Sequence, residues 1–290
     1  YKGKNGCVFP LSALPDDIKF SFSEERKADA TPIAIEKHPV AYPEFEKAFN
    51  KVYSHLKNGD TELVNLTFAT EISAVSLPEV YENASAKYKI LYKNDWVCFS
   101  PEIFVKIEDN LIKTYPMKGT ISATIPDAEA TLLHNEKEID EHHKVVRLLS
   151  DDLQKVATNV HTTRFRYVDV IKKSTGDLLQ TSSEIVGELS ANWQEHLGDL
   201  LAAMLPAGSI AGAPKEKSVA VIDEAETYER GFYTGIAGVF DGKMVDSFVL
   251  IRFIERIGDR YFYKSGAGIT AQSKPLNEYN EIIEKIYIPI

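Results

Sequence analysis

The chain contains very little cysteine. Only Cys7 and Cys98 occur in 290 residues, with no Cys-x-x-Cys pair and no Cys/His cluster at zinc spacing. Small disulfide-stabilised folds and structural zinc sites both require several cysteines or histidines at short spacings. The sequence therefore argues against a disulfide framework and against a structural zinc site.

Long apolar runs and an excess of positive charge are also missing. No apolar segment approaches the roughly 20 residues of a membrane-spanning helix, and the first residues do not form a signal peptide. The net charge of −10 argues against nucleic acid as a partner, because phosphate binding needs a basic surface. A small anionic ligand would need local positive groups or a metal ion. We therefore expect a cytoplasmic enzyme with neither a nucleic-acid nor a membrane partner.

The hydrophobic pattern predicts groups of strands separated by a few helices. Apolar residues recur with helical spacing from Pro43 to Asn58 and alternate as in a strand from Leu63 to Ile72. Further strands are expected at 88–115, 167–171, 231–253 and 260–269, further helices at 127–160, 191–204 and 277–286, and short strands with loops before residue 43. Because the strands come in hairpin-like groups, the pattern favours antiparallel sheets covered by helices.

Lys118 lies in an unusual local setting, between Pro116-Met117 and Gly119. The alternating segment Leu111–Tyr115 precedes it, so we expect the lysine at the end of a strand. The proline restricts the backbone before it, and the glycine permits a close backbone approach after it. This setting suits a catalytic lysine, although a solvated lysine in a turn has the same spacing.

Two pairs of glutamates are candidates for a metal site. Glu138 and Glu141 are three residues apart, as are Glu278 and Glu281, and both pairs lie in predicted helices. Residues at this spacing share one helical face. Carboxylates at such positions can hold Mg²⁺ while waters and substrate oxygens complete its coordination. Two solvated helical faces are the alternative interpretation.

Two glycine-containing segments and one arginine are candidates for ligand binding. The small-residue loop Pro206–Lys215 can expose backbone N–H groups to an anion, although it lacks the Walker A spacing. Gly266-Ala267-Gly268 ends a predicted strand and suggests close backbone approach to a ligand, with a turn or bulge as the alternative. Arg252 is predicted inside the strand Ser247–Phe253, where a buried arginine would need a carboxylate partner.

Five segments of the chain form an ordered set: Pro116–Thr120, Asn135–His142, Gly208–Lys215, Arg230–Gly235, and Gly266–Ile269 followed by Glu278–Glu281. The same segments occur in this order in the chorismate-utilising enzymes, which the chain resembles from about Gly59 to Lys285. Within that superfamily the chain is most similar to the synthase subunit of aminodeoxychorismate synthase. The discriminating residue is Lys118, because anthranilate, isochorismate and salicylate synthases usually have alanine there.

The resemblance implies a fold and a set of site residues. The fold is a single α+β domain over residues 1–290, with a reduced N-terminal region and two large, mainly antiparallel sheets packed together and flanked by helices. Glu141 and Glu281 match direct Mg²⁺ ligands, and Glu138 and Glu278 match partners that act through water or indirectly. Lys118 matches a nucleophile. Residues matching the chorismate pocket are Gly119, Thr120, Ser209, Tyr233, Arg252, Gly266, Ala267, Gly268 and Lys285.

The reaction implied by the resemblance is the Mg²⁺-dependent amination of chorismate to 4-amino-4-deoxychorismate, for para-aminobenzoate and folate biosynthesis. Ammonia would come from a separate glutamine amidotransferase subunit, because no catalytic Cys/His pair of that kind is evident in this chain. Chorismate is a dicarboxylate, so Mg²⁺ could hold the ring carboxylate while Arg252 and backbone N–H groups hold the other. Alternatives are an anthranilate or isochorismate synthase, or a chorismate-binding subunit without turnover.

The chain departs from the family pattern at several polar positions. The family usually has Val-Asp-Leu-x-Arg-Asn-Asp-Leu after the first glutamate pair, and Arg147, Ser150 and Asp151 differ from it here. Gln180 stands where many members have a histidine. That histidine is therefore not available to assist the leaving hydroxyl, although glutamine can still donate a hydrogen bond.

Overall fold

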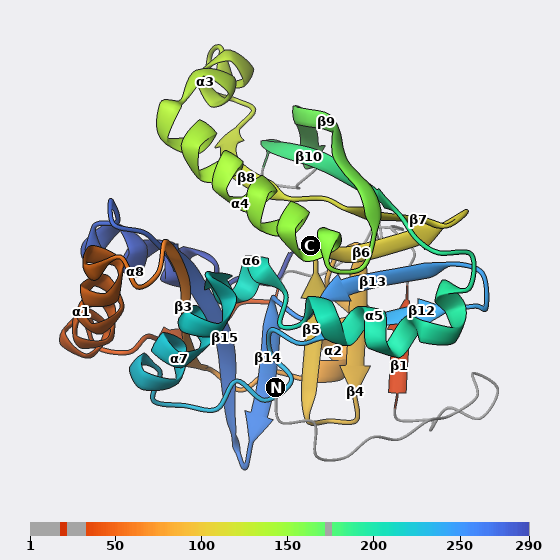
Figure 1. Cartoon of the computed structure of the whole chain (residues 1–290). Coiled ribbons are helices and arrows are strands. Elements are labelled where there is room, and N and C mark those ends of the chain that lie inside the picture. Colours follow the sequence, from red (N-terminus) through yellow and green to blue (C-terminus); the bar gives the residue numbers. More distant parts are fainter. Residues whose placement is uncertain (1–17, 22–32, 172–175, 290) are drawn as a thin grey trace. The chain divides into compact units, whose positions relative to one another are not determined.

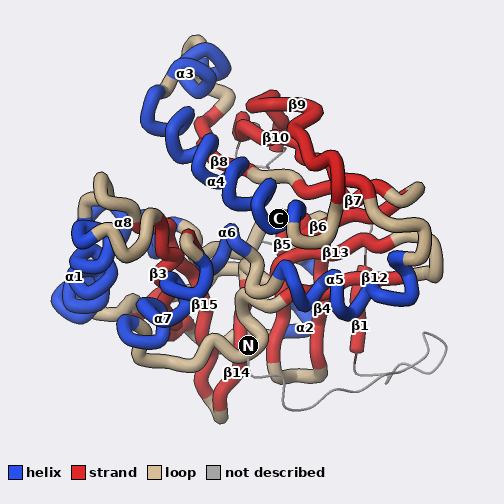
Figure 2. Tube along the Cα trace, viewed as in Figure 1, coloured by secondary structure: helices blue, strands red, loops and turns tan. Residues whose placement is uncertain are grey.

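The computed structural model describes residues 18–21, 33–171 and 176–289 (Figures 1 and 2). The chain divides into two compact units. The first comprises Tyr1–Pro101, Ala211–Gly235 and Leu250–Ile290, and the second comprises Glu102–Ile210 and Ile236–Val249. Cys7 and most of the first 32 residues, where short strands and loops were predicted, lie outside the described residues.

The first unit is built on an eight-stranded antiparallel sheet in the order β1-β4-β5-β14-β15-β3-β11, with β2 also paired to β3. The strands are β1 Ile18–Ser21, β2 Lys37–His38, β3 Leu63–Ile72, β4 Tyr88–Tyr92, β5 Trp96–Ser100, β11 Gly212–Ala213, β14 Phe253–Ile257 and β15 Arg260–Ile269. The strands β3 and β15 pair without interruption from Val64↔Ile269 to Ile72↔Tyr261.

Four helices accompany this sheet: α1 Tyr42–Asn58, α2 Leu77–Asn83, α7 Lys215–Ala225 and α8 Pro275–Glu284. α1 buries Phe45, Phe49 and Val52, as its apolar spacing predicts. It packs on β3, β15, α7 and α8, and Figure 1 shows it beside α8. It ends at Gly59, whose left-handed φ of 78° lets the backbone N–H bond to the last carbonyls.

The second unit is built on a seven-stranded antiparallel sheet in the order β12-β13-β6-β7-β10-β8, with β9 also paired to β10. The strands are β6 Ile103–Glu108, β7 Leu111–Thr114, β8 Met117–Ser122, β9 Thr158–Ile171, β10 Leu178–Glu188, β12 Ile236–Phe240 and β13 Val245–Val249. The helices are α3 Ala128–His134, α4 Glu136–Gln154, a 3-10 turn Trp193–His196, α5 Leu197–Met204 and α6 Gly208–Ala211. α3 and α4 contact β8 and β10.

The predicted α+β class with two mainly antiparallel sheets and flanking helices is confirmed. The single domain over residues 1–290 stays a prediction. Helix α1 and strand β3 match their predicted ranges, and the predicted turn at Asp109-Asn110 joins β6 to β7. Helix α2 was not predicted. In the described part of the chain, no helix has the length and apolar character needed to cross a membrane.

The prediction of one helical region over 127–160 is wrong. Asn135 has an extended backbone that separates α3 from α4, and residues 158–160 belong to β9. The Asn135 side chain accepts a hydrogen bond of 3.2 Å from the Glu138 backbone N–H. It therefore caps the start of α4, which explains why the helix begins anew at this residue.

Two predicted strand positions also need correction. Arg252 does not lie inside a strand, because β13 ends at Val249 and β14 begins at Phe253. Its φ of 55° is left-handed, and the chain passes from the second unit to the first in this connection. Lys118 does not end a strand: β7 ends at Thr114, and Lys118 is the second residue of β8.

Candidate functional site

The residues predicted from the sequence divide between the two units. The second unit contains Lys118, Gly119, Thr120, Glu138, Glu141 and Ser209. The first unit contains Tyr233, Arg252, Gly266, Ala267, Gly268, Glu278, Glu281 and Lys285. Each unit thus carries one glutamate pair, one lysine and at least one glycine of the predicted set.

In the second unit, Lys118 on β8 faces Glu141 on α4. The Lys118 Nζ lies 3.7 Å from the Glu141 Oε2, and the two side chains are 30% and 22% exposed. They form an ion pair that solvent reaches only in part. The structure therefore brings the predicted nucleophile and a predicted metal ligand together, although they are 23 residues apart in the sequence.

A bulge at Gly119 sets this approach. Lys118 pairs with Thr181 and Thr120 pairs with Gln180, so Gly119 is the extra residue of β8. Its φ is 81°, a conformation that glycine adopts readily. A Cβ at this position would lie 3.0 Å from the Glu138 Oε2. The glycine therefore permits both the bulge and the close approach of the Glu138 carboxylate.

A buried hydrogen-bond network next to Glu141 in the sequence joins α4 to β9 and β10. The His142 Nε2 lies 2.6 Å from the Ser183 Oγ, which also accepts the Arg166 backbone N–H at 2.9 Å. Burial, followed by the positive charge of Arg166, lowers the pKa of His142 to about 4, so the ring is neutral at pH 7. The Thr181 hydroxyl on the same strand donates to the Lys118 carbonyl. We did not predict His142, although it directly follows Glu141.

Ser209 has a carboxylate partner that the sequence analysis missed. Its hydroxyl donates to the Glu102 Oε1 at 2.6 Å. The neighbouring Gly208 packs on α4, where a Cβ would lie 2.8 Å from Leu148. The only sequence signal for Glu102 was its place immediately before a strand. Gln180, which replaces the family histidine, has its amide nitrogen 3.4 Å from the Thr120 Oγ1.

In the first unit, Lys285 joins the second glutamate pair to the glycine segment. Its Nζ lies 2.7 Å from the Glu281 Oε1 and donates to the Gly266 carbonyl at 2.8 Å. Glu278 lies one turn earlier on α8 and is buried. The structure therefore confirms that Glu278 and Glu281 share a helix, and it links that helix to β15.

Gly266 of β15 has a packing role. Gly266 pairs with Thr67 in a regular ladder, so neither a turn nor a bulge explains it. A Cβ on Gly266 would lie 2.5 Å from the Thr67 Cγ2, a distance that side chains do not tolerate. Arg252 lies with its guanidinium carbon 5.4 Å from the centre of the Tyr287 ring.

Two ion pairs anchor the segment that leads to Tyr233. Arg230 donates to both Glu226 oxygens, at 2.8 and 2.6 Å, and the Thr67 backbone N–H donates to the same carboxylate at 2.8 Å. Lys264 is buried, pairs with Glu255 at 2.6 Å and donates to the Arg230 carbonyl. These contacts connect the segment to the neighbouring strands β3 and β15. Neither ion pair was predicted, although Glu226 and Arg230 are four residues apart and Glu255 and Lys264 lie on the neighbouring strands β14 and β15.

The donor groups fit a magnesium ion. Each helix offers two carboxylates one turn apart, and Mg²⁺ commonly binds one or two carboxylates together with waters and substrate oxygens. The absence of a Cβ at Gly119 leaves room for the Glu138 carboxylate, whose Oε2 would lie only 3.0 Å from that atom. Within the described residues, no group of three or more His, Cys, Asp or Glu side chains forms a metal site. A magnesium ion bound by these glutamates would therefore have few protein ligands, and waters and substrate oxygens would supply the others.

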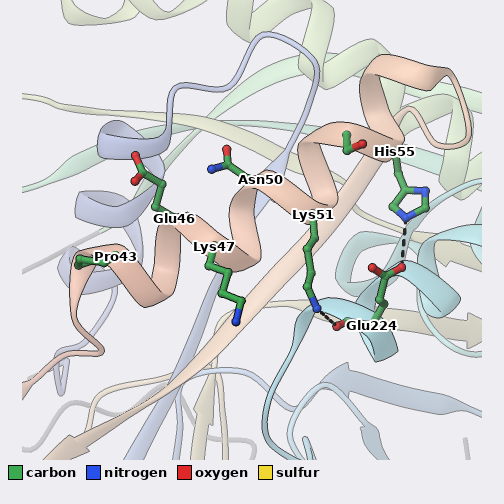
Figure 3. Close-up of a pocket in the computed structure, with 8 residues that line it drawn as sticks. Pro43, Glu46, Lys47, Asn50, Lys51, His55 and Glu224 are labelled. Atoms are coloured by element: carbon green, nitrogen blue, oxygen red, sulfur yellow. Dashed lines mark hydrogen bonds and ion pairs between the residues drawn. The ribbon is translucent and has the colours of Figure 1, made fainter.

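A solvent-open groove of about 590 Å³ lies elsewhere in the first unit, along α1 (Figure 3). Its lining is mostly polar and includes none of the predicted site residues. His55 hydrogen-bonds there to Asp60 at 2.8 Å and to Glu224 at 3.3 Å, and these bonds raise its pKa. Lys51 donates to the Glu224 carbonyl at 2.9 Å. The groove is thus a polar surface feature tied by hydrogen bonds between α1 and α7.

Comparison with known proteins gives one consistent result. Residues 15–290 match the family described as chorismate binding enzyme. An "Uncharacterized PabA-like protein" of Haemophilus influenzae is 50% identical over 89% of this chain and 79% of its own length. Aminodeoxychorismate synthase component 1 of Bacillus subtilis is 32% identical over 86% of this chain and 55% of its own length. The crystal structure of anthranilate synthase component I from Streptococcus pneumoniae has a TM-score of 0.74 at 29% identity, covering 90% of this chain and 60% of that one.

Proposed function

The chain belongs to the chorismate-binding enzyme family, and we propose that it aminates chorismate to 4-amino-4-deoxychorismate. The observation that carries this proposal is the ion pair between Lys118 and Glu141, because it joins a candidate nucleophile to a candidate metal ligand. Similarity to the Bacillus subtilis aminodeoxychorismate synthase component supports the same proposal. The resemblance noted in the sequence also supports it, because Lys118 stands at the position that distinguishes these enzymes from the other synthases.

Lys118 is the proposed nucleophile. Its neutral amine forms a bond to C2 of chorismate and loses a proton, both conjugated ring double bonds shift, and the C4–oxygen bond breaks as the hydroxyl takes up a proton and leaves as water. Ammonia then forms a bond to C4 and loses a proton, both double bonds shift back, and the C2–nitrogen bond breaks as the lysine nitrogen takes up a proton and is regenerated. The hydrogen bond from the Thr181 hydroxyl to the Lys118 carbonyl holds the Lys118 backbone in β8 through these steps, so only the lysine side chain needs to move.

Glu141 and Glu281 are the proposed Mg²⁺ ligands, with Glu138 and Glu278 as indirect partners. When bound, the ion would withdraw electrons from the ring carboxylate and so assist departure of the hydroxyl. The pocket would further include Gly119, Thr120, Ser209, Tyr233, Arg252, Gly266, Ala267, Gly268 and Lys285. Arg252 is the proposed partner of the enolpyruvyl carboxylate, because guanidinium matches a carboxylate with two parallel hydrogen bonds.

Ammonia is proposed to come from a separate glutamine amidotransferase subunit. Such enzymes need a reactive cysteine thiolate, whereas Cys98, the cysteine among the described residues, is buried and burial raises the pKa of its thiol. This supports an external source of ammonia. The same proposal places the reaction in the cytoplasm, within para-aminobenzoate and folate biosynthesis.

The direct test is product identification. The purified chain is incubated with chorismate, MgCl₂ and ammonium, and the products are separated by chromatography and identified by mass spectrometry. The proposal predicts 4-amino-4-deoxychorismate, and omission of Mg²⁺ should abolish its formation. Anthranilate or isochorismate as the main product would assign the chain to another branch of the family. Binding of chorismate without turnover would make it a non-catalytic subunit.

A further inference from the structure

Each of the two proposed direct metal ligands already has a lysine partner within its own unit. Lys118 pairs with Glu141 at 3.7 Å, and Lys285 pairs with Glu281 at 2.7 Å. The lysines come from different settings, one from a strand bulge and the other from the end of α8. The same chemical arrangement, an ammonium group on a ligand carboxylate, thus occurs in both units.

Lys285 has a second contact that does not depend on Glu281. Its Nζ also donates to the Gly266 carbonyl at 2.8 Å, so it can release the carboxylate and keep a hydrogen bond to β15. Lys118 is held by its backbone in the β8–β10 ladder, while its side chain is 30% exposed and can turn away from α4. Neither lysine needs to unfold its surroundings to give up its carboxylate.

We propose that Lys118 and Lys285 occupy the ligand carboxylates in the metal-free protein and compete with Mg²⁺ for them. This inference rests on the proposed function, in which Glu141 and Glu281 bind the ion. One consequence is that metal binding removes the carboxylate partner of Lys118 and leaves its side chain available to the substrate. Each lysine thereby lowers the apparent affinity of the site for Mg²⁺, because it competes with the ion for the carboxylate.

The solvent exposure of the two ion pairs determines how strongly each lysine weakens Mg²⁺ binding. Glu281 is 48% exposed and Glu141 is 22% exposed, so water screens both interactions. Partly exposed ion pairs of this kind change an equilibrium constant by a small factor, about threefold. A divalent ion prevails over one ammonium group at moderate concentration, and the lysines tune its affinity rather than prevent its binding.

The test is calorimetric titration of Mg²⁺ into the chelator-stripped full chain. Lys118→Met and Lys285→Met keep much of the aliphatic stem and remove the charge, so each should lower the dissociation constant by about threefold. Lys285→Arg should raise it, because guanidinium binds a carboxylate through two parallel hydrogen bonds. This variant keeps the inference testable if a methionine variant folds poorly.

Lys144→Met is the matched control. It removes an equal charge from the same helix as Glu141, but from a lysine that pairs with Asp140 at 2.6 Å. The competition account predicts a dissociation constant close to that of the parent. Equal tightening in this control, or no tightening in either methionine variant, would overturn the inference while leaving the metal site in place. A parent chain that binds no Mg²⁺ would overturn the metal site and the inference with it.

Discussion

His142 Nε2 and Ser183 Oγ lie 2.6 Å apart, and this single contact joins the helix that carries Glu141 to the strand that pairs with Lys118. Both side chains are fully buried. A buried polar group that loses its partner costs free energy, because water cannot replace the partner. The contact therefore helps to stabilise the part of the second unit in which the candidate nucleophile and metal ligand meet.

We predict that Ser183→Ala destabilises the chain by about 1–3 kcal/mol, because it leaves the His142 ring and the Arg166 backbone N–H without their partner. Urea unfolding followed by circular dichroism measures the loss. His143→Ala is the control, since His143 is the exposed neighbour of His142 on the same helix. If the Ser183→Ala protein unfolds at the same urea concentration as the parent, the contact between His142 and Ser183 contributes little to stability.

Gly119→Ala should cost more stability than Gly59→Ala. The two glycines have nearly equal φ values, 81° and 78°, so alanine brings similar backbone strain at both positions. Only at Gly119 would the new Cβ meet close neighbours, the Glu138 Oε2 at 3.0 Å and the Leu132 Cδ1 at 3.1 Å, whereas nothing lies within 4 Å at Gly59. We expect each variant to lose about 1–2 kcal/mol from strain, with an additional loss at Gly119 from displacing Glu138 and Leu132.

The measurement is the difference in unfolding free energy between these two variants, together with Mg²⁺-dependent turnover. Gly119→Ala should also reduce turnover, because the bulge places Lys118 beside α4. If both variants are equally stable and keep parental turnover, the bulge at Gly119 is not needed to make room for Glu138 or to position Lys118.

His55 should make stability depend on pH. Hydrogen bonds to Asp60 and then Glu224 raise its pKa above the usual 6.5. The folded chain therefore binds a proton more tightly than the unfolded chain, so this stabilisation is fully present below about pH 6.5 and is lost as pH rises through the folded-state pKa. His55→Asn should accordingly cost more stability at pH 5.5 than at pH 8.5.

Unfolding midpoints of parent and His55→Asn at these two pH values test the prediction. Because carboxylates titrate in both proteins, only the difference between parent and variant is used. A difference that grows toward pH 8.5 would contradict the assigned direction of the pKa shift.

Both glutamate pairs should be required for metal-dependent activity. Glu141→Ala and Glu281→Ala should each abolish Mg²⁺-dependent turnover, because each removes a proposed ligand, while circular dichroism stays parental. Asp140→Asn is the control: it removes a carboxylate beside Glu141 that is 64% exposed and pairs with Lys144. Full activity in either alanine variant would rule out that residue as a required ligand.

Local sequence patterns predicted the elements that depend on interactions between residues close in the sequence, such as apolar spacing and helix capping. α1 has an unbroken apolar stripe and a C-terminal glycine, and β3 has a clear run of strand residues, so both ranges agree with the structure. The three-residue spacing likewise put each glutamate pair on a helix. The ion pair between Lys118 and Glu141 was not predicted as a contact, because it depends on the β-bulge at Gly119 and on how α4 packs against β8.

Other features depended on contacts that no local pattern encodes. Asn135 ends α3 and caps α4, and only its side-chain hydrogen bond distinguishes this break from a continuous polar helix. Arg252 follows an apolar run typical of a strand, yet the chain changes units there and the backbone becomes left-handed. His142 meets Ser183 across 41 residues, so its burial could not be inferred from α4 alone.

Substitution of Lys118 should separate charge from nucleophilicity. Lys118→Ala should still bind chorismate but lose most formation of aminodeoxychorismate, and an anthranilate-type product would indicate that ammonia now approaches C2 directly. Lys118→Arg keeps the positive charge and loses the nucleophile, because guanidinium stays protonated at every working pH. Parental turnover in the arginine variant would show that only the charge matters.

The measurement that tests the central claim most directly is mass spectrometry of the intact chain and its peptides after mixing with chorismate and Mg²⁺ in the absence of ammonia. Under single-turnover conditions the account predicts a covalent adduct on the peptide that contains Lys118, and its disappearance with release of 4-amino-4-deoxychorismate when ammonium is added. Formation of that product from ammonium and chorismate with no adduct on Lys118 at any time point would contradict the nucleophilic role.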